Sequence, residues 1–314
     1  MRAANPRIFI VKVSIRGMLS FNPTYRHGVI LVLFAGLCWS SMGLGIRFIE
    51  TANVWQILFY RSLSLTPFLF LVIAVRSDGN PFPVIRKVGL AGLIGGVALV
   101  FAFTGGIFAI QATTVANAMF LFAAAPFLAA LLGLVILRER VRTATWWAMI
   151  VAMTGIAIMV WEGISLGRMS GNIAALISAL GFAVFTIALR WRKVEDMMPT
   201  VFLAGLFAIM ISAAICLLAG YSLVLPTRDI LVASSLGVFQ VGAGMVIYTI
   251  GSRAVPAAEL ALLSMTEVVL GPFWVWLFLG EMADTFTLLG GGVLLAAIAG
   301  NALSGLRNKP PPIL

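Results

Sequence analysis

Two charged residues lie inside long apolar stretches of the chain, where a charge is costly. Glu267 is near the middle of the run 257–279, and Arg61 lies eight residues into the run 53–75. A charge at the centre of a bilayer costs about 2.5–3.5 kcal/mol on insertion scales, so each of these residues needs a partner or a function. Glu267 could take up and release a proton, or it could be a protonated carboxyl bonded to Ser264 or Thr266.

Arg61 allows two interpretations of equal weight. Its guanidinium group stays charged, so it needs a permanent partner or water at its expected depth of ~12 Å. It could be a structural arginine that forms an ion pair or extends toward the interface. It could equally bind the carboxylate of a solute, with Glu267 binding the ammonium group of the same zwitterion.

Three further side chains are candidates for solute contact in the middle of apolar runs. Trp39 is the one tryptophan of eight that is far from the end of a run, and Phe182 has the same place in the run 171–189. Gln240, in the run 230–250, adds an uncharged hydrogen-bonding group. Packing in the core is the alternative role of both rings. The interpretation that we develop is that the two rings flank a solute between the halves of the chain.

Two prolines interrupt apolar runs at mid-depth. Pro126 lies in the run 113–136 and Pro272 in the run 257–279. A proline removes one backbone hydrogen bond, and the freed carbonyl must find protein or water. We therefore expect helix breaks at both prolines, beside a cavity, with a simple packing kink as the alternative.

Enzyme chemistry finds little support in the sequence. The chain has a single histidine, His27, so the H-E-x-x-H metal motif is impossible, and no phosphate-binding P-loop is present. Its aspartates lie in or at the edges of the loops between apolar runs. We therefore predict no catalytic residues, no metal and no cofactor, and an intramembrane enzyme is the disfavoured alternative.

The composition is that of an integral membrane protein. Hydrophobic residues make up 61% of the 314 residues and charged residues 10%. A spanning helix needs roughly 20 apolar residues, and the sequence contains ten continuous runs of about that length. Because the runs do not alternate, a β-barrel is not expected. The predicted fold is one all-α domain with spans at 28–47, 53–75, 88–110, 113–136, 144–161, 171–189, 199–219, 230–250, 257–279 and 286–305.

The net charge of +10 is explained by the position of the basic residues. With ten spans, 17 of the 21 lysines and arginines fall on the side of the N-terminus and three on the other side, while Arg61 lies within a span. This is the positive-inside distribution, so we predict a multi-pass protein of the cell membrane, a bacterial inner membrane, with the segments 1–27 and 306–314 in the cytoplasm. No nucleic-acid partner is needed to explain the charge.

The second half of the chain repeats the first. Residues 27–47 align with 170–190 at an offset of 143, which pairs Arg47 with Arg190. Each half has five spans, an odd number, so the second half must enter the bilayer from the opposite side. The sequence therefore predicts two inverted five-helix repeats, with a pseudo-two-fold axis in the membrane plane and sites near the midplane. The predicted halves are 28–161 and 162–305.

Equivalent polar residues also recur near the ends of partner helices. Glu139 aligns with Glu281 at an offset of 142, and Asn117 aligns with Glu259 at the same offset. For Glu259, one interpretation is that it caps the helix expected at 257–279, since a carboxylate in the first turn complements the helix dipole. A pair of gates is the other interpretation.

The repeat, Arg61 and the two sequence stretches that end the fourth and ninth spans (APFLAALLGLVILRER and TEVVLGPFWVWLFLGE) resemble the ten-helix EamA-type branch of the drug/metabolite transporter superfamily. The family often has a Glu-Pro-Val stretch in its ninth helix; here Glu267 is followed by Val268, and the proline is Pro272. The resemblance implies a secondary carrier, commonly an exporter of amino acids or other small metabolites.

The residues favour a zwitterionic substrate, with protons as a candidate coupling ion and Glu267 as the candidate proton site. The alternatives within transport are a multidrug or amphiphile exporter and a lipid flippase. A channel is disfavoured, because few polar residues could line a pore. The sequence does not predict an oligomeric state.

Overall fold

The structure, a computed structural model, describes residues 23–194 and 196–307, and the terminal segments 1–27 and 306–314 fall mostly outside these ranges. Within the described residues the chain forms helices and loops, without a strand. The helices are α2 (Tyr25–Arg47), α3 (Val54–Arg76), α4 (Phe82–Lys87), α5 (Gly89–Ala112), α6 (Val115–Phe122), α7 (Ala125–Ile136), α8 (Thr143–Ser165), α9 (Met169–Trp191), α10 (Met198–Leu218), α11 (Thr227–Ser235), the π-helix η1 (Leu236–Ala243), α12 (Gly244–Gly251), the 3-10 helix η2 (Ser252–Ala254), α13 (Ala257–Leu279) and α14 (Thr285–Arg307).

Ten candidate membrane spans are present in the described residues, which confirms the predicted all-helical architecture. They contain 21–28 residues each, enough to cross a hydrocarbon core of about 30 Å. The short helices α6 and α7 together form one span, and α11, η1, α12 and η2 together form another.

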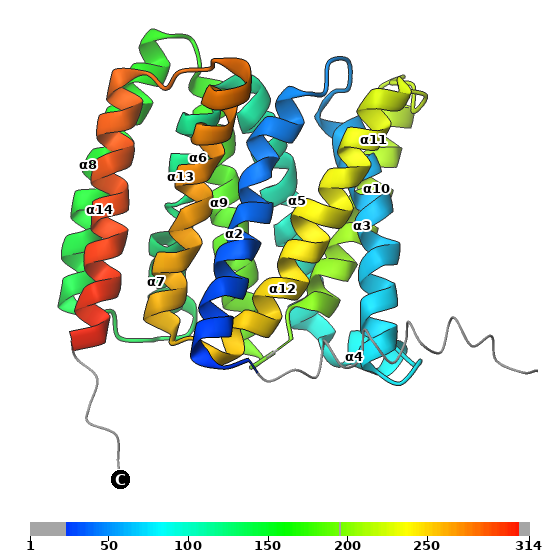
Figure 1. The fold of residues 1–314 in the computed structure, drawn as a ribbon, viewed down its shortest axis with the longest axis horizontal. Helices are drawn as coiled ribbons and strands as arrows, with labels where there is room; N and C mark the ends of the chain where they lie inside the picture. The colour runs from blue at the N-terminus through cyan, green and yellow to red at the C-terminus, as the bar shows by residue number, and fades with distance from the viewer. Residues whose placement is uncertain (1–22, 195, 308–314) are drawn as a thin grey trace, which may run out of the picture.

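The helices of the two halves are interleaved. Figure 1 shows α8 and α14 side by side at one edge of the bundle, α3 with α10 at the other, and α2 between them. At the first edge the helices approach closely: a Cβ atom added to Gly155 of α8 would lie 2.5 Å from the carbonyl oxygen of Gly290 of α14. Small residues at such crossings allow the backbone contacts that hold membrane helices together.

The first helices of the two halves run in opposite directions. Arg47, at the end of α2, and Arg168, at the start of α9, both bind the loop between α13 and α14, through Glu281 and Asp284 respectively. The end of α2 and the start of α9 therefore lie at the same end of the bundle. This is the order expected of an inverted repeat. We call this end the Glu281 end, and the opposite end, with the loop between α7 and α8, the Glu139 end (Figure 1).

At the Glu281 end, the buried carboxylate of Asp229 ties α11 to the loop that leads into α3. It accepts hydrogen bonds from the backbone N–H groups of Thr51 and Ala52 at 3.0 and 3.2 Å, and from the Thr51 hydroxyl at 2.6 Å. Directly after this loop, Asn53 caps α3 in a capping box with Gln56. These contacts fix the start of the helix that carries Arg61.

Candidate functional site

Trp39 of α2 packs against a helix of the second half. Its ring centroid lies 5.1 Å from that of Tyr248 on α12. The contact depends on Gly244, because a Cβ atom at that position would lie 2.5 Å from Nε1 of Trp39. Since Trp39 itself is only partly buried, its ring is held in place on one side and remains accessible on another.

Glu267 lies on α13, at the contact of this helix with α2. A Cβ atom added to Gly36 of α2, one turn before Trp39, would lie 3.8 Å from the backbone nitrogen of Glu267. Helix α13 approaches α2 at Gly36, and Trp274 Nε1 donates to Ser40 Oγ at 2.9 Å, which fixes the two helices together. Trp39 and Glu267 therefore both lie where α2 meets the second half of the chain, Trp39 against α12 and Glu267 at the contact of α13 with Gly36.

Arg61 lies deep inside the protein on α3. It is 3% exposed, and its guanidinium carbon is 4.7 Å from the ring centroid of Phe103 on α5. Among the described residues, none forms a hydrogen bond with its Nε or Nη1 atom. A buried cation without an anion is strongly unfavourable, and no described residue supplies a partner for these two nitrogen atoms.

Gln240 lies on η1, which packs on α3 close to Arg61. A Cβ atom at Gly237 would lie 2.1 Å from the carbonyl oxygen of Arg61, so the two backbones are in contact there. Gln240 is buried, and in the described part of the chain its Oε1 atom has no hydrogen-bond partner. Single π-helical turns inside α-helices are frequent at functional sites. Arg61 and Gln240 therefore both offer unused hydrogen-bonding capacity close to the contact between α3 and η1.

The backbone of Arg61 and the ring of Trp39 contact the same span of the second half, at Gly237 and at Gly244 respectively.

Phe182 occupies a different environment from Trp39. It is 49% exposed, and its ring lies 5.6 Å from that of Phe185 on the same helix. The symmetric ring pair expected from the repeat is therefore not reproduced in the immediate contacts of the two residues. A role of Phe182 in solute binding stays a prediction.

The two prolines differ in their effect on the backbone. Helix α6 ends at Phe122, and α7 starts at Ala125. Phe122 lies four residues before Pro126, and in a continuous helix the proline ring would clash with the carbonyl group of Phe122. At Pro272, by contrast, α13 continues unbroken, so the expectation of a break there is wrong. A long membrane helix can lose one backbone bond at a proline when neighbouring helices compensate. Pro272 still lines a pocket of about 270 Å³, together with Val115, Trp276 and Glu281.

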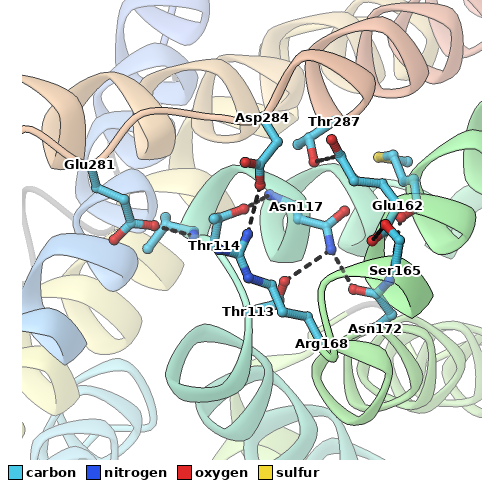
Figure 2. Close-up of polar contacts among 12 residues, drawn as sticks. Thr113, Thr114, Asn117, Glu162, Ser165, Arg168, Asn172, Glu281, Asp284 and Thr287 are labelled. Carbon is cyan, nitrogen blue, oxygen red and sulfur yellow. Dashed lines mark hydrogen bonds and ion pairs between the residues drawn. The ribbon is translucent and has the colours of Figure 1, made fainter.

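A polar cluster that the sequence did not predict lies at the Glu281 end (Figure 2). Arg168 pairs with Asp284 at 2.6 Å, and Thr287 donates to Glu162 at 2.8 Å. Asn117 donates to Asn172, which is also buried. Each residue lies at a helix end or in a loop, where polar residues are ordinary, so the sequence offered no signal for their pairing.

No group of three or more histidine, cysteine, aspartate or glutamate side chains in the described residues could hold a metal ion.

The fold and the repeat define a multi-pass membrane protein with two related halves. The EamA-like transporter family matches the chain twice, over residues 26–161 and 169–303, so the chain belongs to this family. The resemblance noted in the sequence is confirmed, as is the repeat within the chain.

Two relatives and one solved structure extend this result. The pseudopaline exporters CntI of Pseudomonas aeruginosa strains UCBPP-PA14 and PAO1 are 24% and 25% identical to the chain. Each match covers 87% of this chain and 94% of the relative. A crystal structure of another protein is similar with a TM-score of 0.61 at 18% identity, covering 90% of this chain and 98% of its own, which supports the fold. The family and the two relatives are transporters rather than enzymes.

Proposed function

We propose that the protein is a secondary active transporter that exports a small zwitterionic metabolite, an amino acid or a related compound, by alternating access. The observation that carries this proposal is the pair of charged groups inside the membrane region. Glu267 lies on α13 where this helix contacts α2, the helix that carries Trp39, and the Nε and Nη1 atoms of Arg61 have no hydrogen-bond partner among the described residues. Groups of this kind inside a membrane typically mark the path of a substrate or an ion.

The candidate residues suit the two charged groups of a zwitterion. The Glu267 carboxylate is suited to an ammonium group, and the faces of Trp39 and Tyr248 attract cations as well. The Arg61 fork is suited to a carboxylate, which it can bind through two parallel hydrogen bonds. Protons are the proposed coupling ion, with Glu267 as the group that carries them. The relatives are named as exporters, which supports the direction of transport.

A counterflow experiment in proteoliposomes tests the proposal. Vesicles loaded with an unlabelled candidate solute take up the labelled form faster when a carrier exchanges the two. We expect zwitterionic amino acids or their derivatives to exchange and lipophilic cations to exchange poorly. Exchange of lipophilic cations alone would favour the amphiphile exporter, and exchange of neither class would contradict the proposal.

The orientation is a second part of the proposal. Because basic residues are concentrated at the Glu139 end, we expect this end in the cytoplasm and the Glu281 end outside. With the native cysteines Cys38 and Cys216 replaced, Leu166→Cys should react in intact cells with a membrane-impermeant thiol reagent. Arg140→Cys, the matched control at the Glu139 end, should react only after the cells are opened. The reverse pattern would invert the assignment.

Trp39→Ala should weaken solute binding by about tenfold, because a stacked aromatic ring contributes roughly 1 kcal/mol or more to a contact. The yield of folded protein should change little, since Trp39 is only partly buried. The apparent KM of counterflow and the melting temperature in detergent measure the two effects. Trp161→Ala is the control, because this tryptophan is 75% exposed at the end of α8. An equal change in both variants would indicate that Trp39 is not part of the solute site.

A further inference from the structure

Among the ion pairs that connect the halves of the described chain, two are related by the repeat, one at each end of the bundle. In the Glu281 pair, Arg47 Nε lies 2.7 Å from Glu281 Oε2, and Nη2 lies 3.2 Å from Oε1. In the Glu139 pair, Nη2 of Arg190 lies 2.8 and 2.7 Å from the two carboxylate oxygens of Glu139. In both pairs the arginine belongs to one half and the glutamate to the other.

The two pairs are formed by equivalent residues of the repeat. Arg47 and Arg190 are equivalent at the offset of 143, and Glu139 and Glu281 at the offset of 142. Each arginine lies in the last turn of the first helix of its half, α2 or α9. Each glutamate lies in the loop between the last two spans of its half. The second pair is therefore the first pair with the halves exchanged.

The two pairs differ in how tightly they are held. The side chains of the Glu281 pair are 26% and 22% exposed, whereas those of the Glu139 pair are 50% and 42% exposed. Further bonds hold the Glu281 pair. Arg47 donates to the carbonyl oxygen of Thr113 at 2.8 Å, and Glu281 accepts the N–H group of Val115, the first residue of α6, at 2.7 Å. Such bonds to backbone groups strengthen an ion pair that is shielded from water.

A second set of equivalent positions shows the same difference. Asn117, in the first turn of α6, binds Asn172 near the start of α9, and both residues are buried. Glu259, its equivalent in the first turn of α13, accepts a bond of 2.6 Å from the hydroxyl of Tyr25 at the start of α2, and this contact is exposed. In both comparisons, the contact at the Glu281 end is less exposed than its equivalent at the Glu139 end.

Alternating access explains this asymmetry. In an inverted repeat, one end state becomes the other when the two halves exchange conformations. Contacts that the repeat relates should therefore be more enclosed at the closed end and more exposed at the open end.

We propose that the Glu281 pair and the Glu139 pair are the two gate contacts of the transport cycle, each tightened when its own end closes, and that the structure is closed at the Glu281 end. This inference rests on the proposed transport function. In the opposite state, Glu139 would reach the N–H group of Ala257 at the start of α13, which is the equivalent of Val115.

The test measures access to the site from each end rather than transport. In a chain with Cys38 and Cys216 replaced, Trp39→Cys serves as a reporter in membrane vesicles of defined orientation. An impermeant thiol reagent is added at one face at a time. Glu281→Gln should raise the labelling rate from the Glu281 end by about fivefold and lower it from the Glu139 end, because it destabilises the closed gate. Glu139→Gln should act in the opposite direction and slow labelling from the Glu281 end by about threefold.

The opposite signs are what separate gates from simple structural contacts. A structural contact would loosen access from both ends or from neither, and either result would overturn the proposal. Glu50→Gln is the control, since Glu50 forms an exposed ion pair with Arg228 at the Glu281 end, and such pairs contribute little. A shift in this control equal to that of Glu281→Gln would also overturn it. Opposite signs without counterflow by the unmodified protein would uphold the gates and contradict the transport proposal instead.

Discussion

Glu267→Gln is expected to uncouple transport from the proton gradient. Glutamine keeps the shape and a hydrogen-bonding oxygen of the side chain, but it cannot exchange a proton between the two faces of the membrane. Export driven by a pH gradient should therefore fall by about tenfold or more, whereas exchange of solute without a gradient should continue and lose its dependence on pH. Proteoliposomes with and without an imposed gradient measure both quantities.

Glu259→Gln is the matched control for this variant. Glu259 lies on the same helix, but its carboxylate forms an exposed contact with Tyr25 at the Glu139 end. We expect its pH profile to match that of the unmodified protein. If Glu267→Gln also kept the unmodified pH profile, Glu267 would return to the structural role of a buried hydrogen-bonding group.

Arg61→Lys should reduce transport of a carboxylate-bearing solute by about 10- to 100-fold, the effect of losing a charge-assisted bidentate contact. Lysine supplies a shorter, compact ammonium group that cannot form two parallel bonds to a carboxylate. Arg61→Met then separates binding from folding. Because Arg61 is 3% exposed, an apolar side chain of similar length should keep or raise the melting temperature while transport is lost.

Counterflow rates and melting temperatures of both variants test this prediction together. Arg228→Lys is the control, because Arg228 is exposed at the Glu281 end and should tolerate the change. A lower melting temperature in Arg61→Met, in proportion to the loss of transport, would indicate that Arg61 stabilises the fold and does not bind the solute.

The spans could be predicted because membrane thickness and backbone hydrogen bonding leave few alternatives to a helix of about 20 apolar residues. The observed spans begin within three residues of the predicted ones. The local course of the helices was less predictable. Pro126 ends α6 but Pro272 leaves α13 intact, and η1 forms where Gly237 lets two backbones touch. These differences depend on neighbouring helices that a single sequence does not specify.

The candidate site, too, could be predicted only in part. Glu267 and Arg61 could be found from the sequence because a charge inside an apolar run is conspicuous. Tyr248 could not, since a tyrosine near the end of a span is typical of the membrane interface. Its place beside Trp39 follows only from the packing of α12 against α2.

The break between α6 and α7 has a consequence for the resting state of the empty protein. Its repeat equivalent, α13, is continuous, so the two halves do not deform at the same energetic cost. In the proposed cycle we therefore expect the two exchanged arrangements to differ in free energy, with the empty protein mainly in one of them. A difference of about 1.4 kcal/mol already gives a tenfold bias. A solute that arrives at the side facing the rare arrangement binds with an apparent affinity reduced by that factor. We therefore expect the proposed carrier to differ in apparent affinity between its two faces, even where the repeat makes its contacts alike.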